Sequence, residues 1–327
     1  MLTHNIHLRT PIAENRKLPI PVHHELLKSL LYFGIFQYPL TLKELKRFCR
    51  TLTSIEEVEL ELNFLEKGGY VKQKDGFYST GDQDIDLMVE RRLKGNIKAE
   101  EMLKMARKYS KLISYFPFVR GISLSGSLSK GYADEKSDVD YFIITEPGRL
   151  WLCRMLLVLF KRVFLFNSHK YFCVNYFIDT QNLEISDKNL FTATELTTLI
   201  PTCNTSLHRK LMQANPWVKG FFPNTLLETV SGETIPANNS LVKRSIEKIF
   251  QGKLGDKLDG YCFKITIAKW KKKFKNFSDT EFELNLRSKK NVSKHHPRGF
   301  QIKVLKALDE KVKGFEDKFN VRIFKNG

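Results

Sequence analysis

The stretch Ser125-Gly126-Ser127, followed after ten intervening residues by Asp138-Val139-Asp140, decides the expected fold of this chain. Residues 121–124 alternate and lead into the glycine turn as a strand, and residues 139–144 leave it as another. Alternate side chains of a strand share a face, so the two aspartates are expected to project together. The sequence therefore predicts two strands that bracket a loop with paired carboxylates.

The residue types in this loop suit the binding of a nucleotide. Carboxylate oxygens at Asp138 and Asp140 can hold a hard cation such as Mg²⁺ or Mn²⁺. Gly126 lets the backbone approach a phosphate without a Cβ in the way, and the Ser127 hydroxyl can donate a hydrogen bond to it. Lys130 is a further candidate to reach a phosphate, although a lysine in a polar loop is often only solvated.

The pattern resembles the nucleotidyltransferase superfamily typified by DNA polymerase β. The signature of that superfamily is hydrophobic-Gly-Ser, a spacer, and Asp-hydrophobic-Asp at the start of a strand, which Gly126, Ser127, Asp138 and Asp140 match. Helical patterns at 95–116 and 149–163 and a strand pattern at 172–178 also follow the family's order. The resemblance covers about a third of the chain. It implies an α+β fold with a palm-like mixed sheet and the metal-dependent transfer of a nucleoside monophosphate from an NTP substrate.

A second pair, Asp84-Ile85-Asp86, provides an internal control because it has the same spacing. No glycine-serine turn precedes it, and it runs into a helical pattern at 87–93, so we expect carboxylates at a helix N-terminus. For Asp138 and Asp140 the alternative is a pair of solvated turn residues. The turn and the two flanking strand patterns favour the functional interpretation.

The resemblance also implies a third carboxylate on the next core strand, which spans 171–179. Asn175 occupies the aligned position, and its amide can coordinate through oxygen but adds no negative charge. Asp179 is the alternative and is kept as a candidate catalytic residue. The two lie about 13 Å apart along a strand, so only one is expected to reach a metal. Asp179 is equally well explained as a turn residue at the strand end.

The basic residues Arg149 and Arg154 open the helix that is expected after this strand pair. Both are candidates to face a triphosphate, because a guanidinium matches phosphate geometry.

The composition limits the class of protein. The chain has 327 residues, of which 42% are hydrophobic and 28% charged, as in globular proteins. The most apolar run, 155–160, is too short to span a bilayer, so no membrane partner is expected. The first residues lack the apolar stretch of a signal peptide, and a cytoplasmic location is expected. Five scattered cysteines indicate neither a disulfide framework nor a zinc site.

Residues 1–85 are expected to form a winged-helix-like domain. A helical pattern at 24–36, capping boxes at 41–44 and 54–57, and a hairpin over 70–78 that turns at Asp75-Gly76 predict three helices and a wing. The third helix carries five glutamates and would repel phosphates, which favours a protein partner or domain packing over DNA. Lys72 and Lys74 on the wing leave DNA contact open.

The expected nucleotidyltransferase core spans 86–185, and a basic, mainly helical domain is expected at 186–327. Residues 241–327 hold 23 Lys plus Arg and 10 Asp plus Glu, which is +13 of the chain's net +18. Helices are expected to begin at the capping box 192–195 and to cover 241–274 and 300–315. Trp270 and Phe274 alternate with lysines, as in a surface that binds nucleic acid or another acidic partner, but their spacing equally suits core residues.

Three functions follow from these patterns. The first is a metal-dependent nucleotidyltransferase that acts on an unidentified acceptor hydroxyl, with RNA as one candidate. The second is a catalytically weakened nucleotide- or nucleic-acid-binding regulator with the same fold and Asn175 in place of an acid. The third is a winged-helix transcription factor, which the acidic third helix disfavours.

Overall fold

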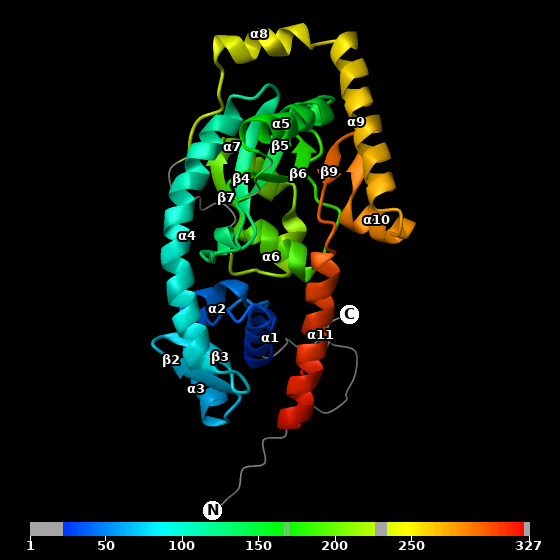
Figure 1. Cartoon of the computed structure of the whole chain (residues 1–327). Helices are drawn as coiled ribbons and strands as arrows, with labels where there is room; N and C mark the ends of the chain where they lie inside the picture. Colours follow the sequence, from blue (N-terminus) through cyan, green and yellow to red (C-terminus); the bar gives the residue numbers. More distant parts are fainter. Residues whose placement is uncertain (1–21, 167, 169, 226–233, 324–327) are drawn as a thin grey trace, which may run out of the picture. The chain divides into compact units, whose positions relative to one another are not determined.

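The computed structural model describes residues 22–166, 168, 170–225 and 234–323 and has an α+β architecture (Figure 1). The chain divides into two compact units. The helix–hairpin unit comprises Met1–Leu93, Trp217–Thr225 and Ile302–Gly327, and the sheet unit comprises Lys94–Pro216 and Leu226–Gln301. Residues 186–327, expected as one C-terminal domain, are therefore shared between both units.

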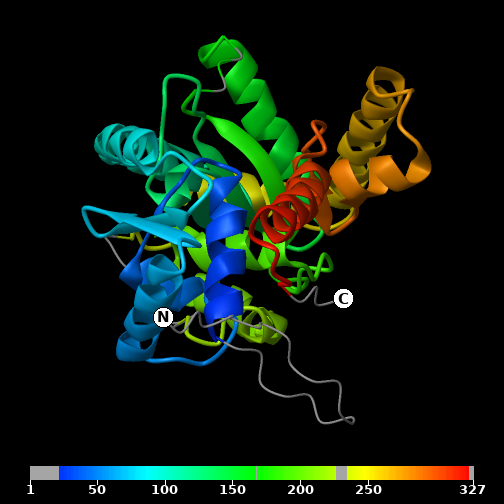
Figure 2. The same ribbon diagram turned by 90° about the horizontal axis from the view of Figure 1, so that it is seen from below.

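The helix–hairpin unit begins with α1 (Val22–Gly34), α2 (Leu42–Phe48) and α3 (Ile55–Lys67). The capping box of α2 is confirmed, because Thr41 and Glu44 exchange both hydrogen bonds. The hairpin is confirmed as well, with β2 (Val71–Lys74) and β3 (Phe77–Thr80) paired across Asp75-Gly76. A short β1 (Leu40–Thr41) adds to β3, and Figure 2 shows the hairpin beside α1.

Helix α4 (Ile85–Ser114) starts where the control pair predicts a helix N-terminus. The Asp84 side chain accepts a hydrogen bond from the Leu87 N–H at 3.2 Å, and Asp86 forms an ion pair with Lys74. The two helical patterns at 87–93 and 95–116 form one continuous helix. The second Asp-x-Asp pair is thus occupied in helix capping and hairpin packing.

The sheet unit contains six strands in the order β7-β4-β5-β6-β9-β8. The three strands that the sequence predicts are confirmed as β4 (Val119–Ser125), β5 (Asp140–Thr145) and β6 (Cys173–Asp179). Strands β5 and β6 are parallel, joined through α5 (Leu150–Phe164), and the other pairs are antiparallel. The sheet is therefore mixed, as expected.

Three short strands were not predicted. These are β7 (Ile200–Cys203), β8 (Ser288–Lys289) and β9 (Val292–Lys294). They come from the region expected to be mainly helical, and β9 extends the sheet beyond β6. Strands of two to four residues carry too little alternation to be distinguished from loops.

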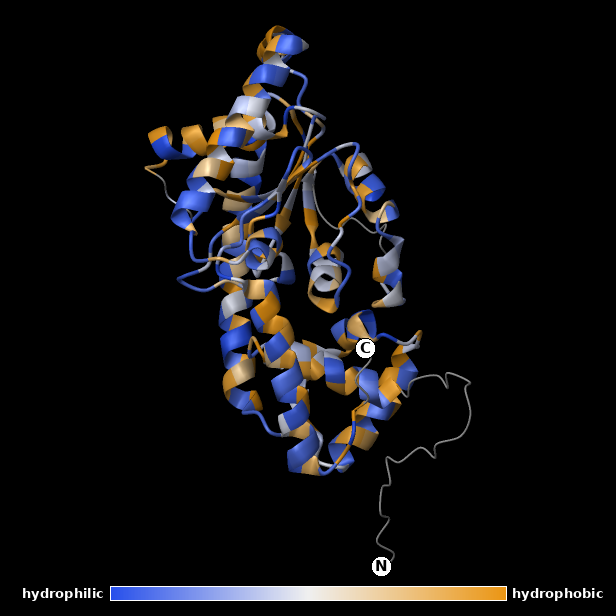
Figure 3. Cartoon of the chain, turned by 90° about the vertical axis from the view of Figure 1, so that its right-hand side faces the viewer, coloured by the Kyte–Doolittle hydropathy of each residue, from blue (hydrophilic) through white to orange (hydrophobic). Residues whose placement is uncertain are grey.

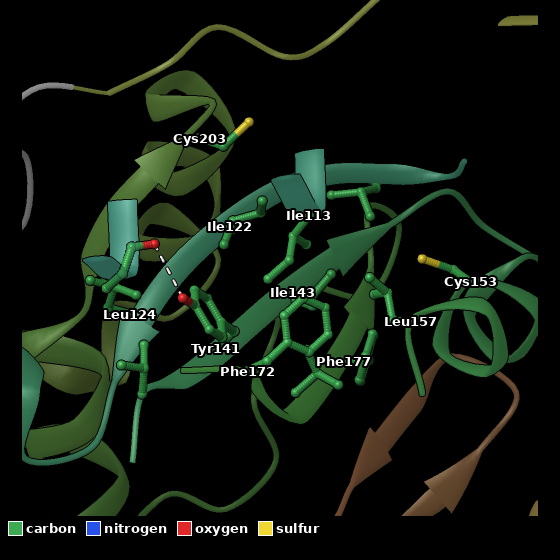
Figure 4. Packing of buried hydrophobic residues seen from close by; sticks show 14 of the residues in the cluster. Ile113, Ile122, Leu124, Tyr141, Ile143, Cys153, Leu157, Phe172, Phe177 and Cys203 are labelled. Atoms are coloured by element: carbon green, nitrogen blue, oxygen red, sulfur yellow. Dashed lines mark hydrogen bonds between the residues drawn. The ribbon is translucent and has the colours of Figure 1, made fainter. Parts of the chain in front are cut away.

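The core of the sheet unit lies on one face of the sheet, beneath α4 and α5. Figure 4 shows Tyr141 and Ile143 of β5 packed with Phe177 of β6 and Leu157 of α5. The buried Tyr141 hydroxyl donates to the Ala106 carbonyl oxygen at 3.1 Å, so its polar end is satisfied. Because Tyr141 and Ile143 face this core, the intervening positions and Asp140 face the opposite side.

The remaining helices are α6 (Leu190–Thr198), α7 (Thr205–Gln213), α8 (Leu241–Ile249), α9 (Lys253–Lys273), α10 (Asp279–Asn285) and α11 (Phe300–Phe319). One expectation is corrected here, because helix α6 is capped by Asn189 and not by Thr192. The helical pattern expected over 241–274 is confirmed as α8 and α9, which Gly252, with φ 74°, separates. The helices alternate hydrophilic and hydrophobic residues along their length (Figure 3).

All five cysteines are free and buried. Over the described ranges, no helix is both long and apolar enough to cross a bilayer.

Candidate functional site

The glycine turn and the first aspartate of β5 are brought together by the antiparallel pairing of β4 with β5. Ser125 pairs with Asp140, so the turn begins directly beside this carboxylate. Gly126 has φ 73°, and a Cβ at this position would lie 2.7 Å from the Asp140 Oδ2 atom. Both the backbone conformation and the close approach therefore require glycine.

Asp138 and Asp140 flank Val139, which is fully buried. The Val139 N–H donates to the Lys170 carbonyl at 2.9 Å, and its carbonyl accepts from the Cys173 N–H at 3.0 Å. These bonds hold the segment extended against the start of β6. The Asp138 side chain is exposed and that of Asp140 is partly buried, so the two carboxylates point away from the side chain of Val139.

The electrostatics at Asp140 are those of a crowded anionic site. Burial raises the pKa of Asp140, and the nearby Asp138 and Glu195 carboxylates add to this effect against the opposing hydrogen bonds from Cys173 and Asn175. The resulting pKa is about 7. A carboxyl group among other carboxylates is costly to ionise without a cation. The site thus favours a positively charged ligand at neutral pH.

Of the two alternatives for the third position, the structure brings Asn175 to Asp140. The Asn175 Nδ2 atom donates to Asp140 Oδ1 at 2.7 Å. Asn175 lies at a register irregularity, because Tyr141 pairs with Val174 whereas Phe142 pairs with Tyr176. An amide therefore takes the place that the family resemblance gives to an acid.

Asp179 lies at the opposite end of β6 and does not join this cluster. It pairs with Thr145, the last residue of β5, whereas Asp140, the first, pairs with Cys173. Six residues of strand separate Cys173 from Asp179, or about 20 Å. The Asp179 carboxylate accepts from the Gln181 N–H at 3.0 Å and the Asn182 side chain at 2.8 Å, as in a turn.

Lys130 is paired with a carboxylate that the sequence analysis did not identify. Its Nζ lies 2.7 Å from Glu195 Oε1 on α6 and 3.1 Å from the Gly126 carbonyl oxygen. Glu195 also accepts from the Gly126 N–H at 3.4 Å. Glu195 therefore braces the glycine turn, and only the packing of α6 reveals this role. The sequence pattern had placed Glu195 only in the capping box expected at 192–195.

Ser127 opens a short 3-10 helix, η1 (Leu128–Lys130), and its side chain makes no capping hydrogen bond. The residue is exposed at the turn, and its carbonyl accepts from the N–H groups of Lys130 and Tyr132 at 3.0 and 3.1 Å. The backbone is thus fixed while the hydroxyl faces solvent. This arrangement suits contact with an external phosphate.

Arg149 has a structural role. Its guanidinium donates to the Phe250 carbonyl at 2.9 Å and to the Asp256 carboxylate at 2.7 Å, and so connects the start of α5 to the start of α9. Arg154 lies one turn further along α5, with its guanidinium over the Trp270 ring at 4.7 Å. The two arginines, both candidates for a triphosphate, therefore have different surroundings.

In the described part of the chain, no group of three or more His, Cys, Asp or Glu side chains is arranged to hold a metal ion. The candidate site thus offers a pair of aspartates, an amide, a serine hydroxyl and a braced glycine turn. No protein-family model, curated protein or solved structure matches this chain.

Proposed function

We propose that the sheet unit is a metal-dependent nucleotidyltransferase of the DNA polymerase β-like superfamily, which transfers a nucleoside monophosphate from an NTP to an acceptor hydroxyl. The observation that carries the proposal is the contact between the two halves of the motif. Gly126 lies so close to Asp140 that no side chain fits between them. A phosphate on the turn would therefore sit beside the carboxylates.

The donor set fits Mg²⁺ or Mn²⁺. All donors are oxygens, and burial among carboxylates raises the pKa of Asp140 to about 7, a cost that a divalent cation would remove. Mg²⁺ in such sites is often bound through one or two carboxylates with the remaining positions filled by water and substrate phosphate. Asp138 and Asp140 would hold it, and the ion would supply neutralisation of charge on the transferring phosphoryl group.

The remaining residues position the nucleotide. The Ser127 hydroxyl would donate to a phosphate oxygen, and the left-handed turn at Gly126 would let the backbone approach it. Lys130 is paired with Glu195, so we assign it to bracing of the turn instead of direct phosphate binding. Asn175 would orient Asp140 through its 2.7 Å hydrogen bond.

The direct test is incorporation of label from each α-labelled NTP in the presence of Mg²⁺ or Mn²⁺, with RNA and protein fractions as acceptors. We expect label transfer by the native chain and none by an Asp138→Ala, Asp140→Ala double variant. An Asp84→Ala, Asp86→Ala variant is the matched control, because that pair has the same spacing but caps α4. Equal transfer by the native chain and the Asp138/Asp140 variant would refute the mechanism.

One observation supports the second candidate, a binding protein with little or no turnover. The third position is the amide Asn175, which cannot take a proton from an acceptor hydroxyl. Substitution Asn175→Asp adds the missing carboxylate at the same atom positions. For a weakened enzyme we expect tighter Mg²⁺ binding and faster label transfer in this variant. NTP binding without transfer in both forms would favour the regulator.

We further propose that the helix–hairpin unit is a winged helix that binds protein. The exposed face of α3 combines acidic residues with apolar ones, since Leu60 is 71% and Phe64 43% exposed. On the hairpin, Lys72 Nζ donates to the Gln83 carbonyl at 3.1 Å, and Lys74 pairs with Asp86. The wing lysines are thus engaged within the unit, which disfavours DNA contact.

A further inference from the structure

We propose that Arg154 is the centre of a phosphate-binding site between α5 and α9 that takes a phosphate group of the acceptor. Arg154 is only 8% exposed. Within the described residues no hydrogen bond or ion pair is formed by its guanidinium, and the buried Nε atom has no partner. Buried guanidinium groups are normally paired with carboxylates, because an unpaired charge is costly to bury.

The aromatic neighbours of Arg154 do not remove this cost. The guanidinium carbon lies 4.7 Å from the centroid of the Trp270 ring and 5.9 Å from that of Trp151. Such contacts stabilise the charge but accept none of the five N–H donors of an arginine. The rings flank the guanidinium group and leave its N–H donors without an acceptor among the described residues.

The surrounding charges are also positive. Burial, with a smaller contribution from Arg162, lowers the pKa of Arg154 to about 10. His295 packs on Trp270 at 4.7 Å, and its pKa is lowered to about 3 by burial and by cations that include Arg154 and Lys273. The cations Arg154, Arg162 and Lys273 thus lie near His295, and no carboxylate in the described ranges acts on Arg154. A cluster of this kind suits an anion.

This cluster is connected to the candidate site by a short chain of contacts. The His295 N–H donates to the Asn175 carbonyl at 2.9 Å, and the Asn175 amide donates to Asp140 at 2.7 Å. Lys161 lies about two helical turns beyond Arg154 on α5. It is close enough to Asp138 for that carboxylate to raise the pKa of the lysine against the stronger effect of burial. The contacts pass through the backbone of Asn175, because Asp140 and the Asn175 side chain face one side of the sheet, whereas Arg154 and Trp270 pack on the core side.

The order of the sheet indicates which substrate carries this phosphate. The glycine turn extends from β4, the carboxylates belong to β5, and the contacts toward Arg154 run through β6 and β9, on the other side of β5. If the turn on the β4 side of β5 holds the NTP, a second phosphate site on the β6 side is left for the acceptor. This assignment to the acceptor rests on the proposed function, whereas the phosphate site itself does not.

The test uses inorganic phosphate as the probe and the full chain as the protein. Intrinsic fluorescence reports binding, because two of the three tryptophans, Trp151 and Trp270, contact Arg154. At constant ionic strength we expect a saturable change in fluorescence and a rise in Tm. In Arg154→Met the apparent affinity for phosphate, measured from both responses, should be about tenfold weaker, as for the loss of one charge-assisted contact.

Two further variants keep the result interpretable. Lys264→Met removes an exposed charge of α9 and should bind phosphate like the native chain. If Arg154→Met does not fold, Arg154→Lys retains the charge without the planar fork and should bind phosphate more weakly than the native chain. The proposal is overturned if phosphate produces no saturable response, or if native chain and Arg154 variants respond alike, which would mean an adventitious ion only.

A competition experiment distinguishes the two sources of phosphate. If phosphate and Mg²⁺·NTP bind together, the site belongs to the acceptor, as we propose. If they exclude one another and Arg154→Met weakens NTP binding, the site holds the triphosphate and the assignment to the acceptor is wrong. Phosphate binding that persists in a chain without label transfer would refute the proposed function alone.

Discussion

At the scale of single residues, the site depends on the absence of a side chain at Gly126. We predict that Gly126→Ala abolishes label transfer, because its methyl group would meet the Asp140 carboxylate at 2.7 Å. Gly131→Ala is the matched control, since Gly131 has φ 74° but open space around its Cβ position. Both variants should lose about 1 kcal/mol of stability to backbone strain.

Activity assays and chemical denaturation separate these effects. Only Gly126→Ala should lose activity while it remains folded. Equal activity losses in both variants would show that backbone strain, and not displacement of Asp140, is responsible.

The raised pKa of Asp140 predicts a cost in stability. The folded chain holds a proton on this carboxyl up to about pH 7, whereas the unfolded chain releases it near pH 4. Stability is therefore lost as pH rises between these values, and the whole cost is present above pH 7. We predict that Asp140→Asn stabilises the chain at pH 8 by on the order of 1 to 3 kcal/mol, with no gain at pH 4.

Thermal melts at both pH values test this expectation. The Asp138→Asn variant, at an exposed position, should gain less stability at pH 8 than Asp140→Asn. Addition of Mg²⁺ at pH 8 should raise the Tm of the native chain but not that of Asp140→Asn. A pH-independent gain in Asp140→Asn would contradict the electrostatic explanation.

At the scale of elements, α9 and the hairpin offer two lysine pairs with different surroundings. Lys271 and Lys272 are exposed on α9, whereas Lys72 and Lys74 are bonded within the helix–hairpin unit. We predict that a Lys271→Glu, Lys272→Glu variant binds single-stranded RNA roughly tenfold more weakly and with a shallower salt dependence. Each lysine contact with an RNA phosphate releases bound counterions, so the loss of two such contacts makes the affinity less dependent on salt.

Fluorescence anisotropy with a labelled oligonucleotide, measured over a range of salt concentrations, provides the readout. Lys72→Glu, Lys74→Glu should leave RNA affinity and duplex-DNA affinity nearly unchanged. Strong loss of duplex binding in the hairpin variant would instead support the transcription-factor hypothesis.

At the scale of the whole molecule, buried histidines predict acid sensitivity. In the sheet unit, burial lowers the pKa of His208 and His296 to about 4, and that of His295 to about 3. The folded chain keeps them neutral, while the unfolded chain takes up protons below about pH 6.5. Stability is therefore complete above that pH and is lost as pH falls toward 4. Asp140 and Asp259, whose pKa values are raised by burial, oppose this trend, but the three histidines outweigh them.

We predict a Tm that decreases steadily from pH 7 to pH 4.5, measured by calorimetry. His208→Gln should flatten part of this decrease, because His208 makes a contact with Ser123 at 3.4 Å that a neutral amide can replace. A Tm that is constant over this range would contradict the predicted neutrality of these histidines.

The sequence by itself determined the features that are local. The Gly126-Ser127 turn, the carboxylates of Asp138 and Asp140, the strands around them and the Thr41 capping box are encoded within segments of a few residues. Turn residues, strand alternation and capping boxes are read from neighbouring positions. For the same reason the control pair at Asp84 was assigned to a helix start, which the structure confirms.

The tertiary structure alone decided which distant residues complete the site. Glu195 reaches the glycine turn because α6 packs there, Asn175 displaces Asp179 because β5 and β6 are parallel, and Arg154 meets Trp270 because α5 packs on α9. These contacts join positions about 30 to more than 100 residues apart. Nothing in a local pattern encodes such separations, since they depend on how complete elements bury their apolar faces together.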